Sequence, residues 1–163
     1  MDGDYTFRDA RRDDDALLSQ WLTSPEARRW WGKPDEQLAL ILEDLDNSAM
    51  RQWIVSFKDR PFAYARAYEV HAWPQLHLAH LPQGAMAIDA FIGVPALIGC
   101  GHGGRFLRLL AERLLAEGTP VIAIDPIVEN TRAQRAYCRA GFREHGRAET
   151  EAGSVILMTF AGS

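Results

Sequence analysis

Several features that mark other protein classes are scarce in this sequence of 163 residues. Its two cysteines, Cys100 and Cys138, are too few for a disulfide framework and follow no metal-ligand spacing. No apolar run approaches the roughly 18 residues that a membrane-spanning helix needs. The first residues are polar and acidic, unlike a secretory signal peptide. We therefore expect a cytoplasmic protein that binds no metal and does not associate with membranes.

An excess of positive charge is also missing. The chain has 18 basic and 22 acidic side chains and a net charge of −4, which argues against a nucleic-acid partner. Hydrophobic residues make up 47% and charged residues 25%, as in ordinary soluble globular proteins. A chain of this length can bury an apolar core, so we expect one domain over residues 1–163.

Hydrophobic patterning along the chain predicts a mixed α/β or α+β fold. We expect strands at residues 5–8, 52–57, 62–70, 86–92, 120–124, from 142 onward and at 155–160. Helices are expected at residues 13–22, 25–31, 35–45, 103–117 and 131–140. Residues 58–61 are expected to form the turn of a hairpin.

Residues 71–84 are expected to form a loop, because they combine two prolines with three histidines. The spacing of His71, His77 and His80 permits a metal site, but no acid or cysteine accompanies them. We therefore interpret these histidines as residues of a surface or active-site loop. Cys100 lies before a predicted helix but has no evident partner base, so it is interpreted as a loop residue as well.

A glycine-rich segment, Gly99 to Gly104, precedes the helix expected at residues 103–117. It satisfies G-x-G-x-x-G, and Asp125 follows about twenty residues later, as in dinucleotide-binding folds. Such folds, however, place the first glycine directly after a strand, whereas residues 93–98 intervene here. A Walker loop is excluded because no Gly-Lys-Ser/Thr follows. Glycines at a helix start still expose N–H groups that suit a pyrophosphate.

Two segments carry a more specific pattern. Residues 98–103 read Ile-Gly-Cys-Gly-His-Gly, and residues 130–142 read Asn-x-x-Ala-x-x-x-Tyr-x-x-x-Gly-Phe. They resemble the R/Q-x-x-G-x-G/A and N-x-x-A-x-x-x-Y-x-x-x-G-F segments of the GNAT superfamily of acyl-CoA N-acyltransferases. The first departs from its pattern at Ile98, where Arg or Gln is usual, and at His102, where an aliphatic residue is common. The resemblance implies a GNAT-type domain with a mixed, mostly antiparallel central sheet flanked by helices.

Within the superfamily the chain is most similar to the aminoglycoside 6′-N-acetyltransferases. The similarity is carried by residues 20–25, 29–32, 61–68, 88–91 and 125–137. It implies direct transfer of an acetyl group from acetyl-CoA to a primary amine, the 6′-amine of an aminoglycoside, and hence antibiotic resistance. A different small amine, such as a lysine-like group or a siderophore precursor, and a non-catalytic acyl-CoA-binding module are the alternatives. The implied partner is a small-molecule amine, bound by a monomer or homodimer.

The resemblance also implies where acetyl-CoA binds. The pyrophosphate is expected on backbone N–H groups of residues 99–104 with help from Arg105, and the pantetheine arm beside residues 87–92 like an added strand. Asn130 is expected to contact the pantetheine region or to cap the helix that it begins. The expected cofactor contacts are Ala90, Phe91, Ile92, Gly99, Cys100, Gly101, His102, Gly103, Gly104, Arg105, Asn130 and Ala133.

Two residues are candidates for proton transfer. Asp89 is an acid inside an apolar strand, where burial without a partner would be costly. The resemblance implies that it acts as general base or electrostatic anchor for the amine; the alternative is an outward-facing acid. Tyr137 matches the general acid that protonates the CoA thiolate, and its alternative is a core tyrosine.

The remaining site residues concern the substrate. The resemblance implies that Trp30, Trp31, Tyr64, Asp89 and Asp125 contact the amine substrate, the tryptophans as an aromatic wall for a cation. The alternatives are core packing for one tryptophan and a turn or helix cap for Asp125. Residues 70–88 contain no Asp or Glu, so we expect weak use of polycations and better use of a less charged amine.

Overall fold

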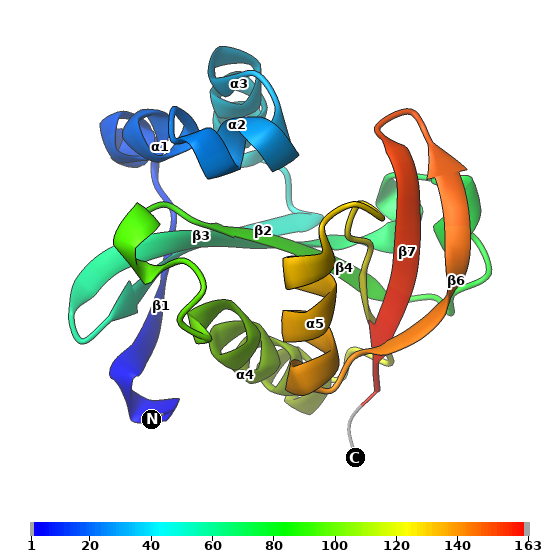
Figure 1. Ribbon diagram of the computed structural model, residues 1–163. Helices are drawn as coiled ribbons and strands as arrows, with labels where there is room; N and C mark the ends of the chain where they lie inside the picture. Colours follow the sequence, from blue (N-terminus) through cyan, green and yellow to red (C-terminus); the bar gives the residue numbers. More distant parts are fainter. Residues whose placement is uncertain (1, 162–163) are drawn as a thin grey trace. The chain divides into compact units, whose positions relative to one another are not determined.

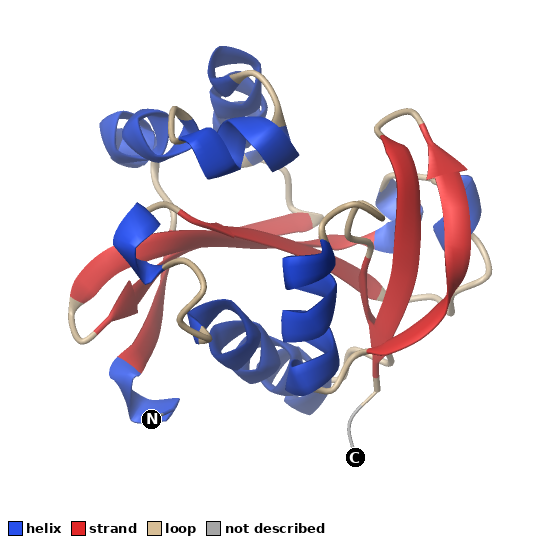
Figure 2. Ribbon diagram, in the orientation of Figure 1, coloured by secondary structure: helices blue, strands red, loops and turns tan. Residues whose placement is uncertain are grey.

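The expected order of elements is present in the computed structural model, which describes residues 2–161 (Figures 1 and 2). The strands are β1 (Tyr5–Asp9), β2 (Met50–Phe57), β3 (Arg60–Glu69), β4 (Met86–Ile92), β5 (Ile122–Ile124), β6 (Arg143–Thr150) and β7 (Gly153–Phe160). The α-helices within the described range are α1 (Asp15–Leu22), α2 (Pro25–Trp31), α3 (Pro34–Asp44), α4 (His102–Ala116) and α5 (Thr131–Ala140).

Hydrogen bonding links the strands in the order β1-β2-β3-β4-β5-β7-β6. The pair β4–β5 is parallel, whereas β1–β2, β5–β7 and β6–β7 are antiparallel, which confirms a mixed and mostly antiparallel sheet. The chain divides into two compact units. Unit 1 comprises Met1–Ala67 and Asp89–His102, and unit 2 comprises Tyr68–Ile88 and Gly103–Ser163. Strands β3 and β4 therefore each contribute residues to both units.

Unit 1 is built on the antiparallel pair β1–β2, which runs from Tyr5 opposite Phe57 to Asp9 opposite Trp53. A two-residue turn at Lys58 and Asp59 connects β2 to β3, and both residues have positive φ, 49° and 67°. That conformation matches the twist of adjacent strands. The turn is shorter than the expected 58–61, because Pro61 lies near the start of a strand, where proline is tolerated.

Helices α1, α2 and α3 lie together in unit 1 (Figure 1). Ser24 caps α2 by accepting a hydrogen bond from the Ala27 N–H at 3.3 Å, and Pro25 occupies the first helical position. One core cluster joins these helices to strands of the same unit through the buried side chains of Leu18, Trp21, Leu22, Ile41, Ile54, Tyr64 and Phe91. This cluster fixes the ends of β3 and β4 that belong to unit 1.

Unit 2 contains the β6–β7 hairpin, paired from Arg143 opposite Thr159 to Thr150 opposite Gly153. Its helices α4 and α5 approach each other closely at Gly104 (Figure 1). A Cβ atom added there would lie 2.9 Å from the backbone oxygen of Ala136. Helix α5 ends at Gly141, whose φ of 113° is left-handed and suits glycine.

The bounds of β4 and α5 agree with the sequence-based prediction, and other ends differ by a few residues. The loop expected at residues 71–84 contains one short 3₁₀ helix, Leu76–Leu78 (η4), and most of a second, Val70–Ala72 (η3). The expected first helix at residues 13–22 is divided into a 3₁₀ turn, Arg12–Asp14 (η2), and α1. Single turns carry too few apolar residues to produce a helical pattern.

Replacing Gly104 with alanine tests the close approach of α4 and α5. We expect Gly104→Ala to lower the free energy of unfolding by about 1–3 kcal/mol, since the added methyl group overpacks the contact with Ala136. Chemical denaturation measures the change. Gly3→Ala is the control, because an added Cβ there meets nothing within 4 Å. Equal stability of the two variants would contradict this packing.

Candidate functional site

The glycine loop depends on backbone conformation. Gly99 and Gly101 have φ values of 78° and 88°, which favour glycine, and a Cβ added at either would meet nothing within 4 Å. The loop follows the 3₁₀ helix Pro95–Leu97 (η5) and leads directly into α4, 15 residues long. The first N–H groups of such a helix have no partner within it. The loop and helix start thus offer the open, N–H-rich cradle that a phosphate requires.

His102, the first residue of α4, directs its side chain into unit 1. Its side chain is buried, and Nδ1 lies 2.6 Å from the Tyr5 hydroxyl oxygen. The ring packs against Phe57 and Phe62 at centroid distances of 4.5 and 5.4 Å. A cofactor contact from this residue must therefore come from its backbone. The imidazole instead ties the start of α4 to the β1–β2 pair.

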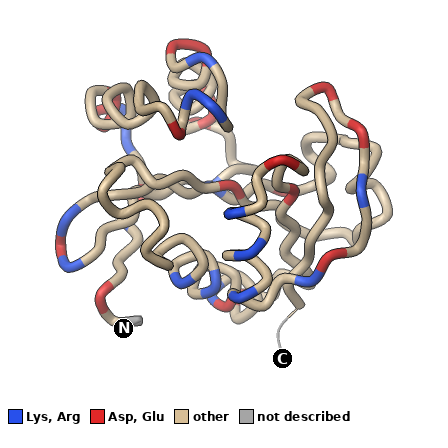
Figure 3. Tube along the Cα trace, in the orientation of Figure 1, with Lys and Arg blue, Asp and Glu red and all other residues tan. Residues whose placement is uncertain are grey.

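Positive charge is concentrated on helices α4 and α5 of unit 2. Helix α4 carries Arg105, Arg108 and Arg113 against a single acid, Glu112, and α5 carries three further arginines and no acid (Figure 3). Arg105 is exposed in the first turn of α4. These guanidinium groups suit an anionic ligand. Cys100 is exposed, with Sγ 3.7 Å from the Ala96 carbonyl oxygen, as expected of a loop residue.

The end of β4 is fixed by packing in unit 1. Phe91 is buried, with its ring 5.0 Å from Trp31 and 5.4 Å from Tyr64 by centroid distance. The Gly93 N–H donates to the Phe62 carbonyl at 2.7 Å, and a Cβ on Gly93 would lie 2.1 Å from the Trp21 ring. Only the backbone of Phe91 is thus available to a ligand. Ala90 and Ile92, the other expected contacts on β4, are half-buried.

Asp89 forms an ion pair that the sequence analysis missed. Its Oδ2 accepts from Nε and Nη2 of Arg66 on β3, at 3.3 and 3.2 Å. The Asp89 and Arg66 side chains are 29% and 19% exposed. Asp89 is thus a partly buried acid with an internal counter-ion. The available signal was the alternation of residues 64–68, Tyr-Ala-Arg-Ala-Tyr, which places a cation inside an otherwise apolar strand.

Aromatic packing holds the arginine from another side. The Arg66 guanidinium carbon lies 4.8 Å from the centroid of the Trp31 ring, a cation–π contact. Trp31 in turn packs edge-on against Tyr64, with centroids 5.9 Å apart. Trp31 was expected to contact a cationic substrate, but one face of its ring is occupied by Arg66.

Tyr64 packs against Trp31 in the interior of unit 1. Its side chain is fully buried, its hydroxyl donates to Gln52 Oε1, and burial raises the pKa of Tyr64 above its ordinary value. Gln52 Nε2 donates to the Ile41 carbonyl at 3.1 Å. The expected substrate contact of Tyr64 does not fit this burial. The Tyr64 hydroxyl hydrogen-bonds inside the protein, because leaving a buried hydroxyl unpaired would lower the stability of the fold.

A second carboxylate lies near Arg66. Burial raises the pKa of the Asp44 carboxyl above its usual range, and the charge of Arg66 opposes that rise. Asp44 is the last residue of α3 and is half-buried. The sequence analysis did not select it, because acids near helix ends are common on protein surfaces. Unit 1 therefore combines one guanidinium with two neighbouring carboxylates.

The two adjacent tryptophans differ in their contacts. Trp31 packs against the core cluster of unit 1. Trp30 Nε1 donates to Glu26 Oε2 at 3.1 Å, one helical turn earlier, and the Arg29 guanidinium carbon lies 4.5 Å from the centroid of its ring. Both side chains are half-buried, so the alternative of one core and one half-exposed tryptophan is met only in part.

In unit 2, Asp125 is paired with a loop histidine. Asp125 directly follows β5, and its Oδ2 lies 2.9 Å from His77 Nε2 on η4, with 19% and 8% of the side chains exposed. His71 Nε2 lies 2.8 Å from the Leu81 carbonyl oxygen, whereas His80 is exposed.

Within residues 2–161, no group of three or more His, Cys, Asp or Glu side chains is placed to hold a metal. Nor does that part of the chain contain a helix both long and apolar enough to span a membrane.

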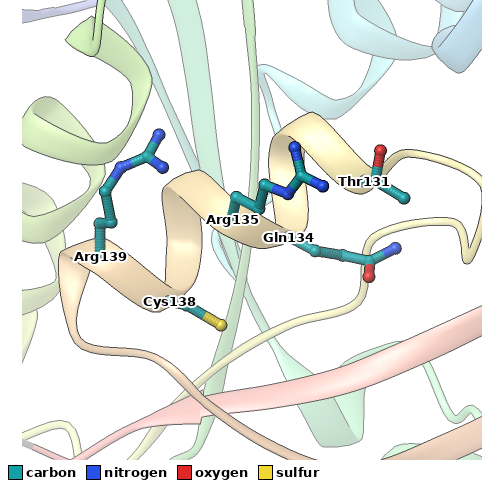
Figure 4. Close-up of a pocket in the computed structure, with 5 residues that line it drawn as sticks. All are labelled: Thr131, Gln134, Arg135, Cys138 and Arg139. Carbon is teal, nitrogen blue, oxygen red and sulfur yellow. The ribbon is translucent and has the colours of Figure 1, made fainter.

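The remaining candidates lie on α5. Asn130 caps the helix by accepting from the Ala133 N–H at 3.2 Å, so the capping alternative holds. Tyr137 is half-buried, and its ring centroid lies 6.1 Å from that of Phe142. Another face of α5 borders an open cavity of about 400 Å³, lined by Thr131, Gln134, Arg135, Cys138 and Arg139 (Figure 4). Ala133 and Tyr137, four positions apart on the other side of the helix, do not line it.

Comparisons with known proteins identify the family. A family model described as an acetyltransferase (GNAT) domain matches residues 10–150. An aminoglycoside N(6′)-acetyltransferase type 1 from Klebsiella pneumoniae is 28% identical over 166 residues, covering 94% of this chain and 81% of that protein. A kanamycin resistance protein from Rhizobium radiobacter is 33% identical over 76 residues, covering 46% of this chain and 70% of that protein.

Solved structures extend the similarity to the fold. The structure of AAC(6′)-Ib with paromomycin and acetyl-CoA has a TM-score of 0.87 and 26% identity, covering 96% of this chain and 93% of that chain. The same enzyme with coenzyme A and kanamycin has a TM-score of 0.87 and 25% identity, covering 96% and 94%. The resemblance seen in the sequence is thereby confirmed, and the chain belongs to the GNAT family of acetyltransferase domains.

Proposed function

We propose that this protein is an acetyl-CoA-dependent N-acetyltransferase that acetylates a primary amine by direct transfer, the 6′-amine of an aminoglycoside being the first candidate acceptor. The observation that carries the proposal is the glycine loop, with positive φ at Gly99 and Gly101, directly before α4. The names of the similar proteins, aminoglycoside N(6′)-acetyltransferase and kanamycin resistance protein, support the acceptor class. We further propose a single-domain cytoplasmic enzyme, a monomer or homodimer that binds no nucleic acid.

The cofactor fits the residues that are present. The backbone of residues 99–104, which has open space at Gly99 and Gly101, would hold the pyrophosphate, with Arg105 adding charge. Of strand residues 87–92, Ala87 is already paired with Ala123 of β5, so residues 88–92 would pair with the pantetheine arm. Asn130 and Ala133 would lie along it. Acetyl-CoA supplies an activated thioester to this site.

The chain itself would move two protons. A substrate ammonium has no lone pair, so it must lose a proton before it attacks the thioester. Asp89, which stays paired with Arg66, would accept that proton, directly or through water. A backbone N–H would stabilise the oxyanion that develops, and Tyr137 would donate its proton to the departing thiolate.

A thiol-release assay over a panel of amines, with mass spectrometry of the products, tests the proposal. We expect CoA release that depends on the amine and a product that gains one acetyl group. The panel includes kanamycin, diamines and monoamines. Acetyl-CoA binding without CoA release for any amine would instead establish the alternative of a non-catalytic acyl-CoA-binding module.

Gly101→Asp tests the phosphate site. We expect acetyl-CoA affinity to fall on the order of tenfold or more, since the new carboxylate repels the pyrophosphate. Gly118→Asp is a matched control: Gly118 also has positive φ, 105°, and open space, but it lies beyond the other end of α4. Isothermal titration calorimetry measures both variants. Binding of NADH in place of acetyl-CoA would overturn the assignment of the loop.

Asp89→Asn and Tyr137→Phe test the proton transfers. We expect Asp89→Asn to lower kcat/KM by about two to four decades, and Tyr137→Phe to slow mainly the step that releases CoA. Asp59→Asn, in the exposed β2–β3 turn, is the control for loss of an acid. Near-wild-type turnover by both active-site variants would rule out these roles. An equal loss of acetyl-CoA affinity would indicate structural damage.

A further inference from the structure

We propose that Arg66 is an internal cation that determines which acceptors the amine site uses, favouring amines of low positive charge over polycations. The proposal rests on the proposed function and deepens it by defining the substrate class. Arg66 was not among the residues expected to bind substrate or cofactor. Its contacts with Asp89 and Trp31 lie within unit 1, as does the neighbouring Asp44.

Arg66 occupies both groups that a substrate ammonium would use. A cation in an enzyme site is held by a carboxylate or by an aromatic face. Arg66 donates two hydrogen bonds to Asp89 Oδ2, at 3.3 and 3.2 Å, and lies 4.8 Å from the Trp31 ring centroid. An incoming ammonium therefore meets a carboxylate whose charge is already balanced.

The guanidinium is held firmly in this position. The Arg66 side chain is 19% exposed, and Trp31 is packed against Phe91 and Tyr64. Tyr64 is fixed through Gln52 to the backbone of α3. Displacing the arginine would leave a partly buried charge without its partner, which is unfavourable. We infer that Arg66 stays in place while the acceptor binds.

This arrangement distinguishes acceptors by the number of ammonium groups that they carry besides the reacting amine. The reacting amine has lost its proton when it attacks. A monoamine therefore has no net charge left beside Arg66 at the moment of attack. A polycation retains its other ammonium groups, and each is repelled by the guanidinium. Asp44, the other carboxylate near Arg66, offsets one such charge at most. Asp125 is likewise engaged by His77 in unit 2.

Arg66→Gln tests the proposal, because glutamine can still donate to Asp89 but carries no charge. We expect the ratio of kcat/KM for kanamycin to kcat/KM for benzylamine to rise about tenfold. Arg60→Gln, which removes an exposed cation at the start of the same strand, is the matched control and should leave the ratio unchanged. Arg66→Met keeps apolar packing on Trp31 and should act like Arg66→Gln, which protects the test if one variant folds poorly.

A ratio that is unchanged or lower in the folded Arg66 variants would overturn the proposal. Kanamycin binding measured by calorimetry without acetyl-CoA separates this result from a failure of the proposed function. We expect the kanamycin Kd to fall about tenfold in Arg66→Gln and to stay constant in Arg60→Gln. If no amine is turned over, the enzyme proposal fails, while the Kd comparison still decides the role of Arg66.

Discussion

The ion pair between Arg66 and Asp89 is the constraint on which the candidate amine site depends. A partly buried carboxylate and a partly buried guanidinium are each unfavourable alone, so each strand must present its charge opposite the other. The packing of Trp31 against Tyr64 and Phe91 meets this requirement, because Trp31 lies against the guanidinium and keeps it in place. The same pair determines how much charge the site offers to a substrate.

The glycine loop imposes a second, independent constraint. The phosphate binding proposed for it would depend on the backbone, through positive φ at Gly99 and Gly101, so few side chains would be needed. His102 departs from the usual family pattern. Its imidazole packs against Phe57 and Phe62 and contacts the Tyr5 hydroxyl, while its backbone N–H remains in the first turn of α4. Side-chain variation at such a position is compatible with an unchanged backbone cradle.

Local sequence patterns predicted local structure well and long-range partners poorly. The bounds of β4 and α5, the Asn130 cap and the glycine loop could be read because neighbouring residues determine them. Asp89 could be selected as an acid in an apolar strand, but its partner Arg66 is 23 residues away and is set by strand register. The His77–Asp125 contact spans 48 residues, and the burial of Tyr64 depends on packing by several elements.

The most direct test of the account observes Arg66 itself during acceptor binding. The Nε–H resonance of Arg66, assigned by its loss in Arg66→Gln, can be followed by NMR while benzylamine or kanamycin is added to the enzyme with CoA. The account predicts that saturating acceptor shifts this resonance, because the amine enters beside Asp89 while Arg66 remains paired. An unchanged resonance at acceptor concentrations that saturate turnover would contradict it.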